Sequence, residues 1–530
     1  MSQIKILDCT LRDGGYINDF YFGKRNITAM IDNLTRSGIE IIECGFLKSG
    51  AVNPDRSLFA KVETISQHLQ NRSNDILYVA MIAMGDISAE EISPCDSTSI
   101  TGIRVTFHEH EIEQAFALGR DLQNKGYTVF MQPVGTTSYN DISLLKLVEK
   151  INQMKPFAFY LVDTLGTMYK NDLLRMFHLV DHNLDPEIAI GYHSHNNLQL
   201  AFSNAQELFQ INSKRDIIID SSVFGMGRGA GNLCTELIAQ YINDNVARRY
   251  DVIPLLEIVD EQLNSIFAQY PWGYSVPYFI ASSHQCHPNY ATFLINKQTL
   301  SVKDIHKILK SMEESKRTLY DHDYINNLYL AYQKHNIDDY KALANLKSLI
   351  NGRQVLVIAP GASIDVHQEQ IITASQNDAT MTISINFNPE FVPVDALFVS
   401  NLKRFKLLDE QAQLETFDKP VIATSNLVTE AREKTYIINY SDYLNDEPSI
   451  ADNAGLMLLN LLQKLGVQSI ILAGFDGFNI GSRDYYRDSS FSSLKADEYK
   501  NRNRATATRL QEIAQTVRVE FLTPSVYAHA

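Results

Sequence analysis

The length, composition and charge of the chain exclude several classes of protein. With 530 residues, 45% of them hydrophobic, it is too long for one hydrophobic core and has ample apolar material for two domains. Its formal net charge of −15, from 47 basic and 62 acidic residues, argues against nucleic acid or an anionic membrane surface as a partner.

Short apolar, β-branched runs recur along the N-terminal half of the chain, separated by segments long enough for a helix. Strands that alternate with helices pair in parallel, and eight such units in roughly 250 residues are the size of a (β/α)₈ barrel. We therefore predict a TIM barrel over residues 1–240. Its strands are expected at residues 4–10, 39–46, 76–84, 102–107, 127–134, 157–164, 188–193 and 217–224.

Polar residues stand at the ends of several of these predicted strands. In (β/α)₈ barrels the carboxyl ends of the strands and the loops after them form the active face, so residues far apart in the sequence meet at one mouth. The residues expected there are Arg12, Asp13, Glu43, Asp163, Thr164, His193, His195 and the glycine-rich segment 225–232.

The pattern changes after Asn232 to amphipathic helices, which we expect at residues 255–270, 302–312 and 340–350. An aromatic-rich stretch, residues 271–290, lies between the first two. We predict that residues 241–350 form a helical extension that covers the barrel mouth.

A second alternation of strands and helices begins near Val355. It predicts a doubly wound, Rossmann-like α/β domain over residues 351–530. The strands are expected at residues 355–359, 381–386, 396–399, 421–424, 436–439, 469–473 and 519–522, and helices at residues 453–465 and 495–516.

A small, glycine-containing turn follows the first strand of this second domain. The backbone N–H groups of such a turn can hold a phosphate where it leads into a helix. Gly361 and Ser363 are therefore candidate phosphate-binding residues, in a domain that would bind a nucleotide or a sugar phosphate. The alternative is a tight strand-to-helix turn, which uses the same residues, because the full dinucleotide fingerprint is absent.

One carboxylate and two imidazoles, from Asp13, His193 and His195, form the clearest chemical pattern. Such a set suits Mg²⁺, Mn²⁺, Co²⁺ or Zn²⁺ acting as a Lewis acid. Residues two apart on a strand face the same side, so the two histidines can bind one ion together. The alternative is one packed and one surface histidine. Arg12 could hold a carboxylate or enolate oxygen, or form a structural salt bridge.

Five segments resemble the metal-dependent pyruvate-carboxyltransferase-like barrels, also described as DRE-TIM or hydroxymethylglutaryl-CoA lyase-like. They are residues 7–15, 42–45, 162–166, 191–198 and 225–232, and they occur in the expected order. This superfamily includes 4-hydroxy-2-oxovalerate aldolase, hydroxymethylglutaryl-CoA lyase and isopropylmalate synthase. The resemblance covers roughly residues 1–300.

The resemblance implies a shared half-reaction, in which a divalent ion chelates a 2-oxo acid and an enolate forms at its methyl carbon. It implies that Asp13, His193 and His195 bind the metal, Mn²⁺ or Mg²⁺ in the first place, with Asn232 as a further ligand or a neighbour of the ligands. Arg12 would stabilise the enolate. The residues that would shape the substrate site, or else pack the barrel, are Glu43, Asp163 and Thr164.

The motifs are most similar to those of the 4-hydroxy-2-oxovalerate aldolases, but one residue differs. Those aldolases place a histidine base three positions after the aspartate of the motif, and here that position is Tyr16. Tyr16 itself is one candidate base. His284 and His287, from the aromatic-rich stretch, are the others, although His287 also suits a turn after a helix.

Three functions are compatible with these patterns. The first is a divalent-metal aldolase that makes or cleaves a 4-hydroxy-2-oxo acid from pyruvate and an aldehyde, for instance a sugar aldehyde in surface-glycan precursor synthesis. The second is an acyl-CoA-dependent synthase or lyase. The third is a non-catalytic barrel that supports a C-terminal glycan transferase or nucleotide-binding module.

The compartment and assembly can also be anticipated. The five cysteines show neither paired spacing nor the density of a disulfide scaffold, which favours a reducing compartment. No apolar run approaches membrane-spanning length, and the chain enters a strand pattern at once. We expect a cytoplasmic protein that acts on small molecules. A homo-oligomer is what the resemblance implies.

Overall fold

The computed structural model describes residues 3–211, 213–297, 299–410, 414, 417–427, 434–478 and 496–528. The chain divides into two compact units. The first comprises Met1–Thr292 and Met312–Tyr320, and the second comprises Phe293–Ser311 and Asp321–Ala530. Residues 241–350, which the sequence predicts as one helical extension, are therefore divided between the two units. No helix in the described part of the chain is both long and apolar enough to cross a membrane.

The first unit contains a closed barrel of eight parallel strands, which confirms the predicted fold. β1 pairs with β2 on one side and with β9 on the other, so the sheet has no open edge. A two-residue strand, β3 (Leu58–Phe59), adds to the end of β2. The barrel strands are β1 (Ile4–Asp8), β2 (Ile41–Leu47), β4 (Leu77–Ala83), β5 (Gly102–Phe107), β6 (Thr128–Pro133), β7 (Ala158–Asp163), β8 (Ala189–Ser194) and β9 (Ile217–Ser221).

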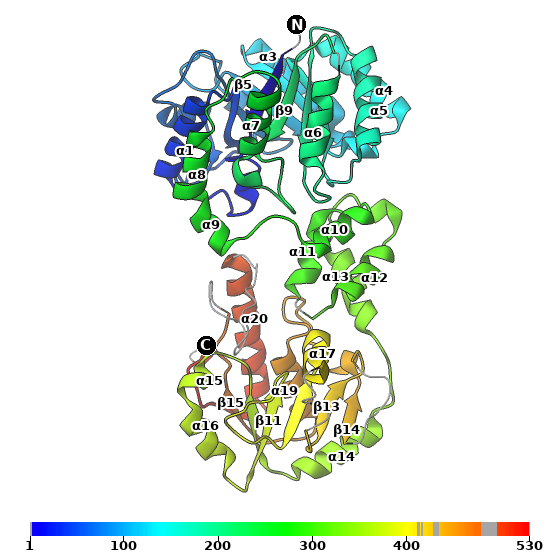
Figure 1. Ribbon diagram of the computed structural model, residues 1–530. Helices are drawn as coiled ribbons and strands as arrows, with labels where there is room; N and C mark the ends of the chain where they lie inside the picture. Colours follow the sequence, from blue (N-terminus) through cyan, green and yellow to red (C-terminus); the bar gives the residue numbers. More distant parts are fainter. Residues whose placement is uncertain are drawn as a thin grey trace. The chain divides into compact units, whose positions relative to one another are not determined.

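Amphipathic helices surround the barrel, and Figure 1 shows several of them side by side on its outer face. In α4 the buried residues Leu144, Leu147, Val148 and Ile151 recur at helical spacing, and the Asn140 side chain accepts the N–H of Ser143 at the first turn. The surrounding helices are α1 (Lys24–Ser37), α2 (Val62–Ile65), α3 (Ile112–Asn124), α4 (Asp141–Met154), α5 (Lys170–Asn183), α6 (Ala201–Gln210) and α7 (Thr235–Asn245).

Two barrel strands, β1 and β9, end two or three residues earlier than predicted. β1 ends at Asp8, because the chain turns there and the N–H of Asp13 bonds to the carbonyl of Cys9 at 2.8 Å. β9 ends at Ser221, and Phe224 adopts a left-handed conformation with φ of 56°, which no strand accommodates. Both turns lie at the mouth of the barrel and bring residues 9–13 beside residues 221–232.

The helices after the barrel continue along its mouth. The predicted helix 255–270 is interrupted: α8 (Ile253–Ile258) and α9 (Asn264–Gln269) are joined by a π-helical turn, Val259–Leu263. The indole of Trp272 donates to the carbonyl of Phe224, in the loop after β9. Ser282, on α10 (Val276–Ser283), donates to the carbonyl of Leu165, in the loop after β7. α11 (Pro288–Asn296) follows.

The second unit is built on a seven-stranded parallel sheet in the order β14-β13-β12-β11-β10-β15-β16. The strands are β10 (Gln354–Ile358), β11 (Thr380–Ile385), β12 (Ala396–Val399), β13 (Val421–Thr424), β14 (Thr435–Ile438), β15 (Ser469–Ala473) and β16 (Arg518–Phe521). The helices include α12 (Val302–Lys310), α13 (His322–Gln333), α14 (Tyr340–Ile350), α15 (Ser363–Val366), α16 (Gln368–Ser375), α17 (Leu402–Glu410), α19 (Ala454–Lys464) and α20 (Ala496–Ala514).

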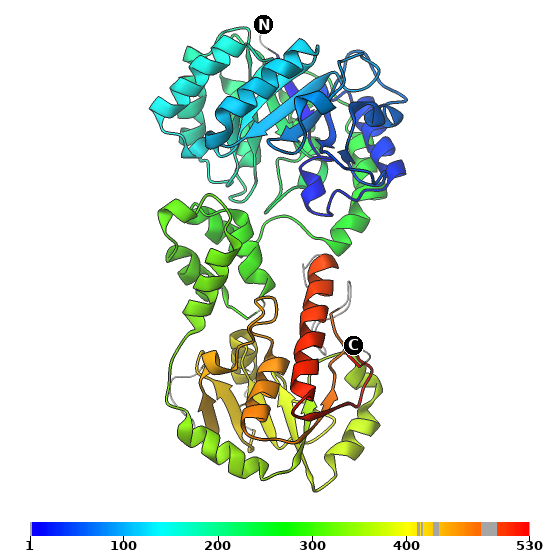
Figure 2. The same cartoon turned by 180° about the vertical axis from the view of Figure 1, so that it is seen from behind.

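Helices cover both faces of this sheet, as the sequence predicts. Val355 and Val357 pack with α14, α19 and α20 on one face, whereas Leu356 and Ile358 pack with α15 and α16 on the other. Figure 2 shows α20 in red beside α19. The strand order reverses between β10 and β15, and a ligand site in such a sheet lies at the carboxyl ends of the strands at this point.

Candidate active site

Asp13, His193 and His195 lie together at the mouth of the barrel. One potential ligand atom from each lies within 4.8 Å of the others. Their exposed fractions are 0, 3 and 5%, so the cluster is withdrawn from bulk water. His193 belongs to β8 and His195 follows it directly, which places both rings on the same side of the barrel mouth.

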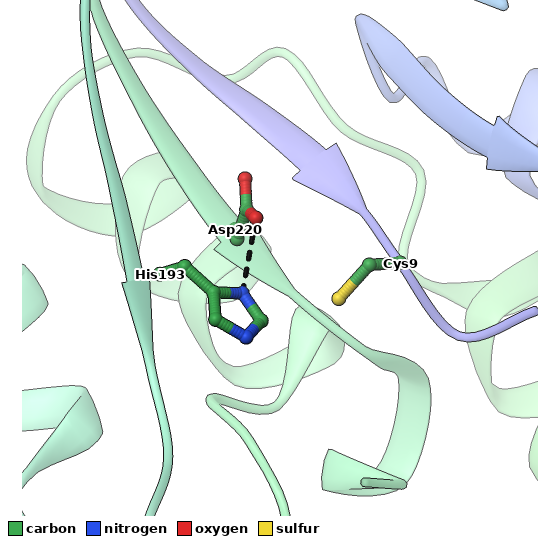
Figure 3. Close-up of side chains that lie close together, drawn as sticks. All are labelled: Cys9, His193 and Asp220. Carbon is green, nitrogen blue, oxygen red and sulfur yellow. Dashed lines mark hydrogen bonds and ion pairs between the residues drawn. The ribbon is translucent and has the colours of Figure 1, made fainter. Parts of the chain in front are cut away.

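Asp220, on β9, holds the ring of His193. Its Oδ2 atom lies 3.0 Å from His193 Nδ1 (Figure 3), so Nδ1 carries the proton and Nε2 is the nitrogen that can bind a metal. Figure 3 also shows Cys9 close to the ring. Its thiol donates to the carbonyl of Ser221 at 3.2 Å, and burial raises the pKa of this thiol well above its ordinary value. Cys9 is therefore a packed thiol and a poor metal ligand.

A buried network of ion pairs supports these residues from within the barrel. Arg104, on β5, donates to Glu43 Oε2 at 2.8 Å and to Asp220 Oδ2 at 2.5 Å. Arg12 donates to the same Glu43 oxygen at 2.8 Å and to Asp13 Oδ1 at 2.6 Å. Gln132 accepts a further bond from Arg104. Each of the two guanidinium groups thus bridges two carboxylates.

The net charge of this network is suited to binding a cation. Two guanidinium groups face the carboxylates of Asp13, Glu43 and Asp220. With neutral histidines these five groups sum to one buried negative charge, which Arg228, close to Asp13, partly offsets. A divalent cation would reverse the sign of the site and allow it to accept an anionic substrate.

Several buried polar atoms beside the cluster also lack hydrogen-bond partners in the described part of the chain. They are Arg12 Nη2, Glu43 Oε1, His195 Nδ1 and Asn232 Oδ1. Such atoms are rare in folded proteins unless water, an ion or a ligand completes them. The donor set and these vacant bonding positions fit a divalent metal and an oxygen-rich substrate.

The titration of the cluster is compatible with metal binding at neutral pH. Burial would raise the pKa of Asp13, but nearby positive charge, above all that of Arg12, outweighs it and holds that pKa well below its ordinary value. Burial lowers the pKa of His195 to about 3, against the attraction of Asp13. A carboxylate and a neutral imidazole are the forms that coordinate metals.

The glycine-rich loop after β9 completes the site. Asn232 Nδ2 donates to Asp13 Oδ2 at 2.8 Å, which leaves its carbonyl oxygen directed elsewhere. A Cβ atom on Gly227 would lie 2.5 Å from Asn232 Nδ2 and 2.8 Å from Asp13 Oδ2, so only glycine fits. The backbone of the loop thereby closely approaches Asp13 and Asn232.

Asn197 joins the loops around one half of the mouth. Its Nδ2 donates to the carbonyl of Leu165 at 3.0 Å, and its Oδ1 accepts the N–H of Ala230 at 2.8 Å. Cβ atoms on Gly166 and Gly229 would come within 2.9 and 2.7 Å of it. The loops after β7, β8 and β9 are therefore held by one buried side chain.

Asp163 and Thr164 lie at the mouth, but both bond to the backbone. The Asp163 carboxylate accepts the N–H groups of Thr167 and Met168, and burial raises its pKa to about 6. Thr164 Oγ1 accepts the N–H of Gly135. Both side chains fix the loop after β7. Substrate contact by either stays a prediction.

Tyr16 and His287 face a common neighbour, Arg228. The Arg228 guanidinium lies 4.4 Å from the centre of the Tyr16 ring, which also packs edge-on against Phe20. Burial, then the charges of Arg228 and His108, lower the pKa of His287 to about 3. His287 Nδ1 accepts the N–H of Asn289 at the first turn of α11. His287 therefore stabilises a turn, which is the alternative role considered for it.

In the second unit, the Gly361–Ser363 turn lies between β10 and α15. The donors of Ser363 are already occupied, since its N–H bonds to Asp476 Oδ2 at 2.7 Å and its hydroxyl bonds to Asp476 Oδ1. A phosphate at these residues stays a prediction.

Sequence reasoning missed Arg104 and Asp220, which hold Glu43 and His193. Each lies within a predicted apolar strand, Arg104 in residues 102–107 and Asp220 in residues 217–224. A charged residue inside an apolar run is a usable signal, because burial of a charge requires a partner.

The fold and site define the first unit as a (β/α)₈ barrel with a buried cluster suited to a divalent metal. A family model described as HMGL-like matches residues 3–260. The resemblance of this barrel to the superfamily of aldolases and lyases is thereby confirmed.

Two relatives and one solved structure illustrate the similarity. The 4-hydroxy-2-oxovalerate aldolase of Geobacillus genomosp. 3 is 26% identical over 249 residues, 45% of this chain and 70% of that protein. The oxaloacetate decarboxylase of Mycobacterium tuberculosis is 23% identical over 279 residues, 51% and 79% of the two chains. The crystal structure of an N-terminal domain from Bacteroides vulgatus superposes with a TM-score of 0.50 at 24% identity, over 57% of this chain and 99% of that one, and shows the fold.

Proposed function

We propose that the chain is a divalent-metal-dependent aldolase that makes or cleaves a 4-hydroxy-2-oxo acid from pyruvate, or a related 2-oxo acid, and an aldehyde. The observation that carries the proposal is the buried Asp13–His193–His195 cluster with Arg12 beside it. The names of the aldolase relatives support it. A sugar aldehyde, as in glycan precursor synthesis, is one acceptor to test.

In this proposal Asp13, His193 and His195 hold Mn²⁺ or Mg²⁺, and Asn232 Oδ1, which is buried without a partner among the described residues, would be a further ligand. When bound, the cation supplies the Lewis acidity that polarises the donor's carbonyl group and acidifies its methyl group. Asp220 and Asn232 keep the ligands oriented through their bonds to His193 and Asp13. The chain's own task is to bind the 2-oxo acid next to this cluster.

Arg12 stabilises the charge that develops on the donor oxygen. Two of its nitrogens are held by Asp13 and Glu43, and Nη2 is buried without a partner among the described residues. A fixed donor of this kind needs no reorganisation when the methyl proton leaves. Glu43 sets the direction of the guanidinium and is a positioning residue.

Tyr16 and His287 are the groups proposed to transfer protons. Tyr16 follows the metal-binding Asp13 by three residues, and Arg228 packs on its ring. In its phenolate form, Tyr16 would accept the methyl proton and become the neutral phenol. His287 Nδ1 accepts a backbone N–H, so its proton lies on Nε2, from which it can hydrogen-bond to the aldehyde oxygen of the acceptor.

A second candidate, decarboxylation of oxaloacetate, has one specific observation in its favour, the similarity to the oxaloacetate decarboxylase. Loss of CO₂ from oxaloacetate leaves the same enolate that deprotonation of pyruvate gives. Arg12 and the metal cluster would stabilise this enolate in the same way. Oxaloacetate therefore belongs in the substrate screen, together with acyl-CoA donors, which would release a free thiol.

The first experiment follows the methyl protons of pyruvate by NMR in D₂O, with full-length protein supplied with Mg²⁺, Mn²⁺, Co²⁺ or Zn²⁺ in turn. We expect metal-dependent exchange without any acceptor. Asp13→Ala should abolish it, and Asp121→Ala, on the exposed surface of α3, should leave it unchanged. Absence of exchange with all four cations, in protein shown by calorimetry to bind one of them, would remove pyruvate as the donor.

A further inference from the structure

The second unit contains a cavity of about 370 Å³ at the carboxyl ends of its central strands. Ala359 follows β10, Asn386 follows β11, Ser400 follows β12 and Gly474 follows β15, and all four line it. The cavity thus lies where the strand order reverses. Its volume is near the lower end of the ~300–1,000 Å³ range of small-molecule sites, which suits a ligand smaller than a dinucleotide.

The first turn of α19 supplies free donors to this cavity. Asn453 accepts the N–H of Leu456 with its side chain and lines the wall with Ala454 and Gly455. The N–H groups of Ala454 and Gly455 have no hydrogen-bond partner among the described residues. α19 spans 11 residues, so its positive end favours an anion here.

Arg502, on α20, adds a positive charge to the wall. Its guanidinium lies 5.8 Å from the Phe478 ring and makes no ion pair within the described part of the chain. Asp452, also on the wall, accepts the Tyr329 hydroxyl, faces Lys297 at 3.8 Å and is attracted to Arg502 as well. Lys297 and Tyr329 stabilise this carboxylate more than Arg502 does, so part of the charge of Arg502 remains for a ligand.

Polar side chains on the wall also lack partners. The hydroxyls of Tyr440 and Thr506 make no hydrogen bond of good geometry among the described residues, although the two residues are only 1 and 2% exposed. Tyr329 and Gln333 lie near the first hydroxyl, and Tyr527 lies near the second. Asn386 accepts the N–H of Ser400 with its Oδ1 atom, which leaves its amide N–H₂ group for another acceptor. Buried hydroxyls and amides of this kind suit a ligand rich in hydroxyl groups.

The neighbouring turn, Gly361–Ser363, is an unfavourable position for the anion. Asp476 accepts both donors of Ser363, and a Cβ on Gly361 would lie 2.6 Å from its carboxyl carbon. A phosphate there would meet a carboxylate at contact distance, which is unfavourable. α19 and Arg502 offer the positive side of the same cavity.

We propose that this cavity binds a hydroxyl-bearing phosphate monoester of the size of a mononucleotide or a sugar phosphate. The phosphate lies between the first turn of α19 and Arg502, and the hydroxyl groups meet Tyr440, Thr506 and Asn386. A mononucleotide and a sugar phosphate both carry these phosphate and hydroxyl groups. The aromatic side chains of Phe478 and Tyr527 on the wall make a nucleotide worth testing first.

The test is isothermal titration calorimetry on the full-length protein. The probes are the four ribonucleoside monophosphates, ribose 5-phosphate, glucose 1-phosphate, the matching nucleosides and inorganic phosphate. We expect at least one phosphate monoester to bind, and its unphosphorylated counterpart to bind at least tenfold more weakly. Preference for a nucleotide assigns the nucleotide source, and preference for ribose 5-phosphate or glucose 1-phosphate assigns the sugar phosphate.

Two variants link binding to this cavity. Arg502→Gln should raise the Kd for the best phosphate monoester at least tenfold, whereas Arg504→Gln, an exposed arginine on the same helix, should not change it. Thr506→Val removes an unpartnered hydroxyl and should weaken binding severalfold without lowering the melting temperature. No binding of any probe at millimolar concentration, or binding that is indifferent to Arg502→Gln in folded protein, would overturn the proposal.

Discussion

His193 Nδ1 lies 3.0 Å from Asp220 Oδ2, and the same oxygen accepts a bond from Arg104 at 2.5 Å. The carboxylate therefore has two tasks: it fixes which nitrogen of His193 carries the proton, and it neutralises a fully buried guanidinium. A change at Asp220 consequently reaches the metal site without removing any ligand.

Asp220→Asn should lower the affinity for Mn²⁺ by about 10- to 100-fold, the usual loss when the partner of a metal-binding histidine is altered. Calorimetric titration of metal-free protein with Mn²⁺ measures it. The control is Asp216→Asn, just before the same strand, whose surface pair with Lys5 should matter little. Equal affinities in all three proteins would show that His193 does not depend on Asp220.

Arg12→Lys should separate metal binding from catalysis. A lysine keeps the charge but cannot bridge Asp13 and Glu43 while presenting a third donor. We expect the rate of pyruvate proton exchange to fall about 10²- to 10³-fold, with less than a tenfold change in Mn²⁺ affinity. Arg36→Lys, at an exposed pair with Glu257, is the matched control. Unchanged exchange would remove Arg12 from the proposed chemistry.

Gly227→Ala should damage the metal site directly. The added Cβ would lie 2.5 Å from Asn232 Nδ2 and 2.8 Å from Asp13 Oδ2, so one of these residues must move. We expect at least a tenfold loss of Mn²⁺ affinity in folded protein. In Gly102→Ala the Cβ would instead meet Val79 at 2.8 Å in the barrel wall. That variant should lose thermal stability and keep its metal affinity.

Tyr16→Phe tests the proton-transfer assignment. If the Tyr16 phenolate accepts the methyl proton, loss of its oxygen should slow exchange about 10²- to 10⁴-fold while the ring still packs against Phe20 and Arg228. Tyr21→Phe, at an exposed tyrosine nearby, should have no effect. If exchange survives in Tyr16→Phe and is lost in His287→Gln, the base is His287 and not Tyr16.

His68 should make the protein sensitive to acid. Burial, with a smaller contribution from Lys24, lowers its pKa from 6.5 to about 4 in the folded protein. The unfolded chain therefore takes up the proton first, and stability falls as the pH drops from 6.5 towards 4. The melting temperature of His68→Gln should fall less between pH 7 and pH 5 than that of the unaltered protein. The exposed His182→Gln should behave like the unaltered protein.

The strands of both units could be predicted from the sequence, because each is a short apolar run between helical segments and both sheets are parallel. The approximate place of Asp13, His193 and His195 followed from the same pattern, since strand ends of a closed barrel converge. The ends of β1 and β9 could not be predicted. They depend on the bond from the Asp13 N–H to Cys9 and on the left-handed Phe224, which no local pattern reveals.

The network behind the site was also beyond sequence reasoning. Arg104 and Asp220 are 116 residues apart in the chain, and only the closure of the barrel brings them to hydrogen-bond distance. The partner of Ser363 is likewise distant, since Asp476 comes from the loop after β15. The sequence suggests a phosphate at that turn, whereas the fold places a carboxylate there.

Asn197 limits which loops at the mouth of this barrel can change in sequence and length during evolution. Because one amide ties together the loops after β7, β8 and β9, an insertion in any of them would loosen the other two and the metal-binding histidines with them. New acceptor preferences are therefore expected to arise on the opposite part of the rim, in the loops after β2, β4 and β5. Laboratory libraries aimed at altered specificity should be randomised there.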